Sequence, residues 1–260
     1  MWGRIRYFLL YVFIFLLISG IIKDKVFDTP MMASKKVKKF TMGQVGADKP
    51  VRAIPLTKKI TYSVYFYSIL PMGKMCFEEE KEKNEFIYTL EVMTGDTWIK
   101  QFIEANASVQ ARLDGKTLLT NSYLEKTKVR EKVKTKEIIF DHEKLIARRS
   151  DVKIKISKDT YDPVGAFIHA ITASYIDQKV YEFKFLSKEE IYILKSTLIS
   201  KKNDLYEICL EMFREDSSSS HGAHIYVWVT ADEARIPVLF KSWMPAGYGS
   251  VVIDSVELYE

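Results

Sequence analysis

Residue types that usually carry out catalysis are scarce and scattered in this 260-residue sequence. The carboxylates at 78–82 are typical of a solvated turn, because the acid and base of a glycosidase are more often flanked by pocket aromatics. The sequence contains no nucleophile-elbow motif, phosphate-binding glycine loop or dinucleotide-binding motif. Its four histidines have no cysteine or carboxylate partner at the spacing of a zinc site: His142, His169, His221 and His224. We therefore expect a protein that is not an enzyme and that needs no cofactor or metal ion.

Basic side chains form the most unusual pattern. Residues 126–158 contain twelve basic and five acidic residues, whereas residues 50–260 as a whole carry a net charge of −1. In an exported protein such a patch would favour anionic partners, such as lipid phosphates or acidic glycans. The alternative is a solvated edge strand that lysines protect against aggregation. A strand of period two would display six of these residues on one side, and two more alternate similarly in a later strand: Lys126, Lys128, Arg130, Lys132, Lys134 and Lys136, then Lys153 and Lys155.

The N-terminal residues indicate a compartment. Arg4 and Arg6 precede an apolar run at 7–22, and charged residues follow it at 23–25. This arrangement predicts a signal peptide or a signal anchor over residues 1–25, and the positive charge before the run predicts that the rest of the chain is exported. The protein would then lie in the periplasm, or be anchored in a membrane and face the periplasm or the cell exterior.

A basic linker is predicted over residues 26–55, where proline and glycine interrupt any apolar periodicity. Its lysines at 35–39 either lie against anionic lipid headgroups or are solvated. We expect no nucleic-acid partner, because no aromatic residue lies among these lysines before Phe40.

Residues 56–260 are predicted to form a single β domain. A hydrophobic fraction of 47% with 28% charged residues excludes a wholly disordered chain and a polytopic membrane protein. Alternating runs separated by turn residues predict about a dozen strands, with a first turn at Pro71–Gly73 and another at Asp114–Gly115. Short connections make the order antiparallel. We expect a large meander that forms a barrel or half-barrel.

One helix is predicted near residues 162–176. Asp162 supplies an N-cap acceptor and Pro163 suits the first helical position. The apolar residues that follow have helical spacing, so the helix should pack on one face of the sheet, with Gly165 permitting a close approach. These apolar residues are Phe167, Ile168, Ile171 and Tyr175.

The sequence contains two cysteines, Cys76 and Cys209. An even number in an exported chain permits a disulfide, and both lie in predicted strands that could be neighbours. The spacing does not establish the required Cα separation of about 5.5 Å. A disulfide and two buried thiols both remain open at this point.

Four segments carry a resemblance to a known family. They are the hairpin from Tyr62 to Gly73, the helix start Tyr161-Asp162-Pro163, the motif Trp228-x-Thr230-x-Asp232-x-x-Arg235-x-Pro237-Val238, and a glycine-containing turn into the last strand. Together they resemble the bacterial domain of unknown function 3108 over about residues 56–260. This resemblance implies an exported envelope protein with a barrel-like antiparallel β architecture and no established activity. The chain departs from the family pattern at Val164-Gly165 and in a charged, serine-rich loop.

The tryptophan-to-proline motif has a structural and a functional interpretation. Thr230 ends a strand, Asp232 can cap the turn, and Arg235 lies near enough to pair with it. Pro237 indicates a strand start or an edge position, since it donates no ladder hydrogen bond. The alternative is that Asp232 and Arg235 form a polar site at the mouth of the barrel.

Two functions from different classes follow. The first is a binding module whose aromatic interior holds a lipid, a glycolipid or another apolar ligand. The second is a structural or interaction scaffold with a filled barrel, whose basic strands dock an anionic surface or a partner protein. The two differ in whether the interior is empty. The interior candidates for ligand contact are Tyr62, Phe66, Trp98, Phe102, Trp228 and Trp243.

Overall fold

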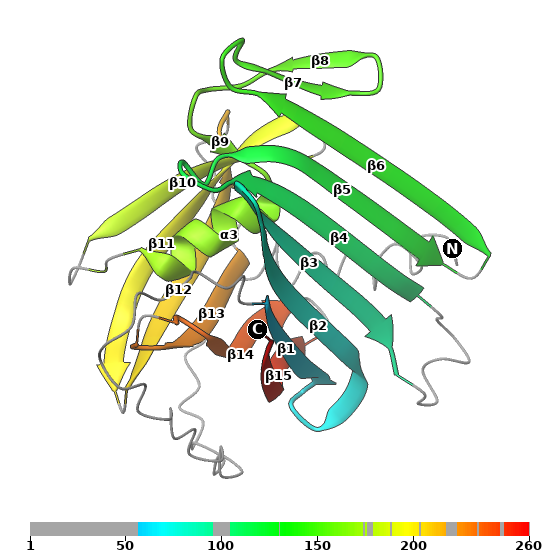
Figure 1. Ribbon diagram of the computed structural model, residues 1–260. Helices are drawn as coiled ribbons and strands as arrows, with labels where there is room; N and C mark the ends of the chain where they lie inside the picture. The colour runs from blue at the N-terminus through cyan, green and yellow to red at the C-terminus, as the bar shows by residue number, and fades with distance from the viewer. Residues whose placement is uncertain are drawn as a thin grey trace, which may run out of the picture.

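The fold is one large, curled antiparallel sheet with a single helix on its concave side (Figure 1). A computed structural model describes residues 57–95, 105–129, 131–173, 175, 179–187, 189–202, 204–216, 223–232, 234–244 and 247–259. The predicted signal segment at 1–25 and almost all of the linker lie outside these residues. Within them the sheet has fifteen strands.

The first half of the chain forms eight strands: β1 (Thr57–Phe66), β2 (Leu70–Glu82), β3 (Glu85–Thr94), β4 (Ala105–Asp114), β5 (Thr120–Val129), β6 (Lys132–Asp141), β7 (Ile146–Arg149) and β8 (Val152–Lys155). The second half contains β9 (Thr160–Tyr161), helix α3 (Pro163–Thr172), β10 (Val180–Ser187), β11 (Glu190–Lys202), β12 (Leu205–Arg214), β13 (Ala223–Thr230), β14 (Pro237–Met244) and β15 (Gly247–Tyr259).

The strand order joins two meanders at the middle of the sheet. It runs β8-β7-β6-β5-β4-β3-β2-β1-β15-β14-β13-β12-β11-β10-β9, so the first described strand pairs with the last. All neighbours are antiparallel except β9 and β10. The predicted antiparallel half-barrel is therefore confirmed, and its two edge strands, β8 and β9, are close in sequence.

Helix α3 fills the concave side between the two meanders. It contacts β4 of the first half and β9, β10 and β11 of the second half. Asp162 caps it as predicted, and the helix ends at Thr172, so Tyr175 lies beyond it. Gly165 meets its neighbours closely, because a Cβ there would lie 2.9 Å from Asp162 Oδ2 and 3.1 Å from Thr120 Oγ1. The predicted close approach of the helix to the sheet is confirmed.

The first hairpin turn differs from its prediction. It lies at residues 67–69, where Tyr67 and Ser68 both have a positive φ. Pro71 instead belongs to β2 and pairs with Tyr65 beside a register shift. A bulge accommodates this proline within a strand, so its presence did not mark the turn.

The basic segment at 126–136 also differs from its prediction, because it forms a hairpin between β5 and β6 rather than one strand. Lys128 pairs with Val133, and residues that pair across a ladder point to the same face. An even-numbered residue of β5 therefore shares its face with an odd-numbered residue of β6. The shared parity of the basic residues does not place them on one side.

The two cysteines are free thiols on strands that are not neighbours. Cys76 lies in β2 and Cys209 in β12, and the sheet places β1, β15, β14 and β13 between them. With neighbouring strands about 4.8 Å apart, this separation excludes a disulfide within one chain. The hypothesis of two thiols holds, with Cys209 buried and Cys76 half-buried.

No helix among the described residues is both long and apolar enough to span a membrane.

Candidate ligand-binding site

A small cavity lies between helix α3 and the concave face of the sheet. Its volume is about 60 Å³. Both meanders and the helix contribute to its walls, which are formed by Tyr62, Met75, Phe77, Leu90, Val109, Tyr123, Pro163, Val164, Phe167, Phe185, Leu194, Leu210, Pro237 and Phe240. The cavity is thus where the two halves of the sheet and the helix meet.

The walls carry only two side-chain hydroxyl groups, and both have partners. Tyr62 donates a hydrogen bond to the Pro237 carbonyl oxygen at 3.0 Å, and Tyr123 donates one to Glu125 at 3.4 Å. Burial raises the pKa of both tyrosines well above the ordinary value, so both hydroxyls stay neutral. A wall of this kind favours apolar atoms and offers no acid, base or nucleophile for catalysis.

The size of the cavity limits what it holds in this conformation. An engineered protein cavity of about 150 Å³ admits benzene, and sites for larger organic ligands reach roughly 300–1,000 Å³. At about 60 Å³, this cavity accepts only a few carbon atoms. A longer ligand requires helix α3 or a lining side chain such as Phe167 to move.

The N-terminal end of α3 is fixed by a buried polar network. The Thr120 hydroxyl donates to Asp162 Oδ2 at 2.7 Å and accepts from the Asp162 backbone N–H at 2.9 Å. Asp162 Oδ1 accepts from the backbone N–H groups of Val164 and Gly165. Burial raises the pKa of Asp162 to about 6, although these hydrogen bonds oppose the rise. Because Thr120 begins β5, the network ties the helix to the first meander.

A second polar cluster lies just beyond the C-terminal end of α3. The Tyr175 hydroxyl donates to the Ala170 carbonyl oxygen and hydrogen-bonds Ser196. Ser196 is fully buried, pairs across the ladder with Leu210, and lies two residues after Leu194. Leu194 and Leu210 both line the cavity. The apolar wall therefore continues directly into this polar cluster.

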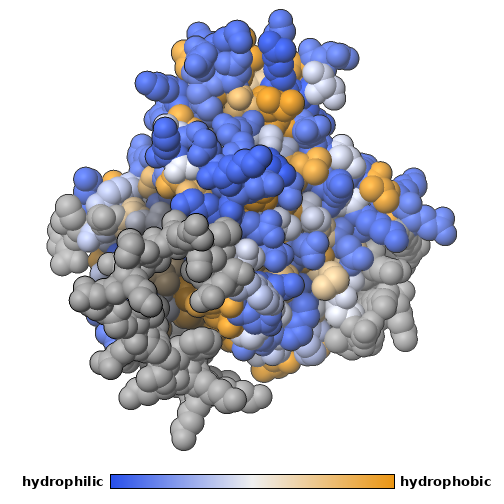
Figure 2. Space-filling model, viewed as in Figure 1, coloured by the Kyte–Doolittle hydropathy of each residue, from blue (hydrophilic) through white to orange (hydrophobic). Residues whose placement is uncertain are grey.

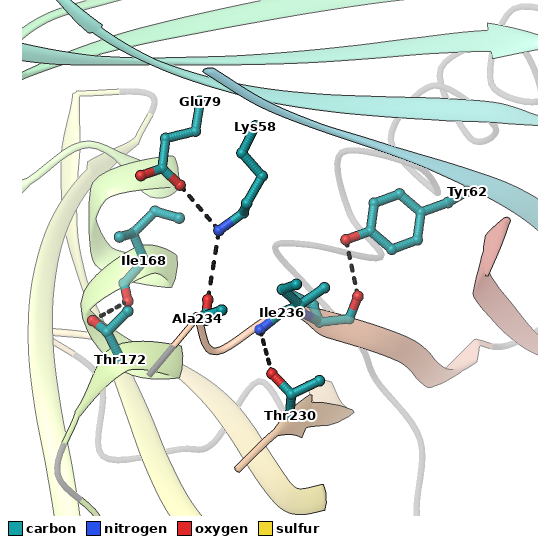
Figure 3. Close-up of polar contacts among 9 residues, drawn as sticks. Lys58, Tyr62, Glu79, Ile168, Thr172, Thr230, Ala234 and Ile236 are labelled. Carbon is teal, nitrogen blue, oxygen red and sulfur yellow. Dashed lines mark hydrogen bonds and ion pairs between the residues drawn. The ribbon is translucent and has the colours of Figure 1, made fainter. Parts of the chain in front are cut away.

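Several hydrogen bonds hold the described residues of the loop between β13 and β14. The Ile236 N–H donates to Thr230 Oγ1 at 2.9 Å, and that hydroxyl donates to Asp232 at 2.6 Å. Lys58 reaches across from β1, contacts Glu79 at 3.2 Å and donates to the Ala234 carbonyl oxygen at 3.5 Å (Figure 3). These bonds confirm the structural interpretation of the tryptophan-to-proline motif as turn chemistry.

Arg235 does not pair with the Asp232 carboxylate as predicted. Only its backbone N–H contacts that residue, donating to the Asp232 carbonyl oxygen at 3.4 Å. Its guanidinium carbon lies 4.3 Å from the centre of the Tyr206 ring. Its Nη1 atom is buried and has no hydrogen-bond partner among the described residues. The predicted pairing of Arg235 with the Asp232 carboxylate is therefore wrong.

The six predicted aromatic contacts have different outcomes. Tyr62 lines the cavity, whereas Phe66 lies farther along β1 and is not among the lining residues. Trp228 pairs with Glu207 and Leu239 in the ladders. The residues next to these partners, Ile208 and Phe240, are buried on the concave face, so Trp228 faces the convex side. Trp98 and Phe102 lie outside the described residues, and the side chain of Trp243 is not described either.

The sequence analysis missed most of the lining residues, although signals for some of them exist. Phe167 belongs to the predicted apolar face of the helix, and Phe240 lies three residues after the predicted strand start at Pro237. Leu194 and Leu210 each end a run of consecutive apolar residues, so the local pattern does not show which of these residues face the cavity. Which residues surround a cavity depends on the position of α3, and local pattern does not encode that position.

The basic residues are divided between the two faces. Lys126 and Lys128 are exposed on the convex face, together with Lys153 and Lys155. The β6 lysines share the face of Tyr123 instead: Lys132, Lys134 and Lys136. Lys136 lies 5.7 Å from the Tyr123 ring centre and 4.0 Å from Glu125. Arg130 lies outside the described residues, so the predicted single patch is reduced to the convex lysines.

Those convex lysines are accompanied by an arginine and by apolar side chains. Arg148 pairs with Lys153 in the ladder, and Val133 and Ile139 are 63% and 53% exposed on the same face. Figure 2 shows apolar side chains among hydrophilic ones around the β7–β8 hairpin, at the top of the view. We refer to Lys126, Lys128, Arg148, Lys153 and Lys155 as the convex basic patch.

The described histidines serve as hydrogen-bonding residues in the fold. His142 and His169 contact the carbonyl oxygens of Thr120 and Leu118, and His224 contacts Glu211 at 3.2 Å. No group of three possible metal ligands occurs among the described residues. His221 lies outside them.

Fold and site together define a barrel-like β protein with an apolar interior. Consistent with this class, the chain is similar to the crystal structure of a beta-barrel-like protein of the domain of unknown function DUF1849 from Brucella abortus. The two have a TM-score of 0.58 and 10% sequence identity, over 81% of this chain and 100% of the other. At that identity the likeness concerns the fold alone.

The family follows from the sequence comparison. The family model described as a protein of unknown function, DUF3108, matches residues 61–255, and the chain belongs to this family. No curated protein matches the chain. The resemblance inferred from the hairpin, helix start and tryptophan-to-proline motif is therefore confirmed.

Proposed function

We propose that this protein is a non-enzymatic binding module that holds a lipid or another apolar ligand between α3 and the concave face of the sheet. The observation that carries this proposal is the cavity of about 60 Å³, which both meanders and α3 line with apolar side chains. An empty apolar cavity destabilises a fold in proportion to its volume. A ligand that fills it recovers that free energy.

The magnitude of this gain is modest in the closed conformation. At roughly 24 cal/mol per Å³, a cavity of this size costs about 1.4 kcal/mol, which corresponds to a tenfold change in affinity. A longer acyl chain would have to replace the contacts of Phe167, which packs 5.8 Å from the Phe240 ring centre. The proposal therefore includes a displacement of Phe167 or of α3 as the ligand enters.

The proposed location is the cell envelope. Arg4 and Arg6 before an apolar run support export through a signal peptide or a signal anchor, and the family resemblance supports the same compartment. In the periplasm, or on a membrane facing the periplasm or the cell exterior, lipids and glycolipids are available as apolar ligands.

Changing the volume of the cavity tests the proposal. N-phenyl-1-naphthylamine, an apolar fluorescent probe, would be titrated into the full-length protein and its variants. Phe167→Ala enlarges the cavity and should tighten probe binding at least tenfold, whereas Val109→Ile fills it and should weaken binding. Val133→Ile, the same substitution as Val109→Ile at an exposed strand residue, serves as the control. If neither the natural protein nor folded Phe167→Ala binds the probe, the proposal is wrong.

A second candidate function is supported by the convex basic patch. Its five cations beside the exposed Val133 and Ile139 suit an anionic surface, as an interaction scaffold would require. Flotation with phosphatidylglycerol vesicles tests it. Lys126→Glu with Lys153→Glu should abolish flotation, while Lys83→Glu with Lys116→Glu, at exposed turns, should not. Equal flotation of the two double variants would exclude a role for the patch.

A further inference from the structure

Arg235 is held in an unusual backbone conformation beside the cavity. Its φ is +45°, in the left-handed region that residues with a side chain rarely adopt. Such a conformation persists only when the surrounding structure fixes it. The bonds of Thr230 with Ile236 and Asp232, and of Lys58 with the Ala234 carbonyl oxygen, fix it here. The loop thus presents one arginine in a defined position.

The guanidinium group of Arg235 lacks the carboxylate partner that three other described arginines have. Arg112, Arg149 and Arg214 each pair with a glutamate, within 2.6–3.3 Å. Arg235 forms no such ion pair with a described residue, and its buried Nη1 has no acceptor among them. Its guanidinium carbon lies 4.3 Å from the Tyr206 ring centre, so the ring occupies one side of the group. An unsatisfied buried donor of this kind calls for an acceptor that a ligand can supply.

Two neighbouring residues connect Arg235 with the wall of the apolar cavity. Pro237, two residues later, lines the cavity, and its carbonyl oxygen accepts from Tyr62. Arg235 also lies near Tyr175. Burial raises the pKa of Tyr175 to about 12, and the positive charge of Arg235 opposes this rise. Tyr175 hydrogen-bonds Ser196, which adjoins the cavity wall. A cationic group therefore lies at the polar end of an otherwise apolar site.

The separation of the two parts suits an extended amphipathic molecule. The Tyr206 ring contacts the guanidinium group of Arg235, and Leu210 lines the cavity. The two residues are four positions apart on β12, so their Cα atoms are separated by about 13 Å. Ile208 lies between them and is fully buried. A ligand that reaches from Arg235 to the cavity therefore has to displace the contacts that bury Ile208.

We propose that Arg235 binds the oxyanion head group of an amphipathic ligand, a carboxylate or a phosphate monoester, whose apolar chain occupies the cavity. This inference rests on the proposed function and adds the chemical class of the ligand. The planar fork of arginine matches both oxyanions, and charge-assisted hydrogen bonds are stronger than neutral ones.

Three matched twelve-carbon ligands test the inference: dodecanoic acid, dodecyl phosphate and dodecanol. Binding to the full-length protein would be measured by competition with N-phenyl-1-naphthylamine, or by isothermal calorimetry. We expect at least one anionic ligand to bind about tenfold more tightly than dodecanol. Arg235→Gln should remove this preference and leave the affinity for dodecanol unchanged. Arg112→Gln, which removes a charge from the convex face of β4, should retain the preference.

The outcomes separate this inference from the proposed function. Tighter binding of dodecanoic acid alone assigns a carboxylate, and tighter binding of dodecyl phosphate alone assigns a phosphate. If dodecanol binds as well as both anions, or folded Arg235→Gln keeps the preference, the assignment of Arg235 is wrong while apolar binding stands. If the protein binds none of the three, both proposals fail. Circular dichroism and thermal unfolding confirm that the variants fold, and Arg235→Lys provides a second variant that keeps the charge but loses the fork.

Discussion

Two threonine–aspartate pairs in this protein make the same hydrogen bonds in opposite surroundings. Thr120 accepts from a backbone N–H at 2.9 Å and donates to Asp162 at 2.7 Å. Thr230 accepts from a backbone N–H at 2.9 Å and donates to Asp232 at 2.6 Å. Thr120 and Asp162 are fully buried, whereas Asp232 is exposed.

The difference in burial goes with a difference in what each pair holds in place. The Thr120–Asp162 pair joins residues 42 positions apart and satisfies its donors at the start of α3. The Thr230–Asp232 pair is local and shapes a loop that leaves the Nη1 atom of Arg235 without a described acceptor. The first pair fixes the helix that closes the cavity, and the second orients a group that suits a ligand. Each of the following predictions tests this contrast.

The largest effect should come from removing the buried hydroxyl. Thr120→Val keeps the shape of the side chain but leaves the Asp162 N–H and one carboxylate oxygen without their partner. Each orphaned buried group costs roughly 1–3 kcal/mol, so we expect the free energy of unfolding to fall by about 3 kcal/mol. Urea denaturation at pH 7 measures this.

The same substitution at the exposed pair is the matched control. Thr230→Val should cost only about 1 kcal/mol, because water can replace the lost bond of the exposed Asp232 and only the Ile236 N–H loses a partly buried acceptor. Equal losses for the two variants would show that burial does not distinguish the pairs. The two midpoints of unfolding can be compared directly if both variants keep the same denaturant dependence.

The sequence predicted one partner of the buried pair and missed the other. Asp162 followed by Pro163 is a local signal for a helix start, and the structure confirms it. Thr120 lies at the start of a strand, and its contact with Asp162 exists only because the sheet curls around α3. Local patterns encode caps and alternation, but they do not encode which distant strand reaches a cap.

The pH dependence of stability should come next in size. Burial raises the pKa of Asp162 from 3.8 to about 6, so the folded state binds this proton more tightly than the unfolded state. The resulting stability is present below pH 4 and is lost as the pH rises through 6. From pH 4.5 to 6.5, this carboxyl should lower the free energy of unfolding by about 2 kcal/mol.

Asp162→Asn isolates this contribution, because the amide keeps an acceptor for the helix cap but does not titrate in this range. We expect the difference between the natural protein and the variant to change by that amount across the pH series. A profile for Asp162→Asn that runs parallel to the natural one would contradict a titrating buried carboxyl at the helix start.

The face of a residue was predictable only where no unrecognised turn preceded it in the same predicted strand. Tyr62 was placed correctly in the interior, because the misplaced turn at residues 67–69 comes after it. The basic residues at 126–136 were assigned to one face because the hairpin between Val129 and Lys132 was not recognised. One missed turn exchanges the faces of every following residue, since the side-chain period is two.

A smaller effect is expected from filling the cavity between the two threonine–aspartate pairs. Val109→Ile adds one methylene group to the cavity wall, which is worth about 0.8 kcal/mol when buried without strain. The free energy of unfolding should rise by about that amount, as measured in urea. Val133→Ile, on the exposed side of β6, should change it by less than about 0.5 kcal/mol. A loss of stability in Val109→Ile would mean that the wall cannot accept even one more carbon.

The smallest effect on stability is expected at Arg235, and its size distinguishes a structural role of this arginine from a role in ligand binding. Arg235→Met loses the stacking of the guanidinium on Tyr206, worth about 0.5–1 kcal/mol, and removes a buried N–H group that costs roughly 1–3 kcal/mol when unpaired. The flexible methionine keeps apolar contact with the ring. The two contributions offset each other, so the free energy of unfolding should fall by less than about 0.5 kcal/mol or should rise. A loss above about 1.5 kcal/mol would assign Arg235 to the structural group with Thr120, whereas a neutral result leaves ligand binding as the reason for a strained, unpaired arginine beside the cavity.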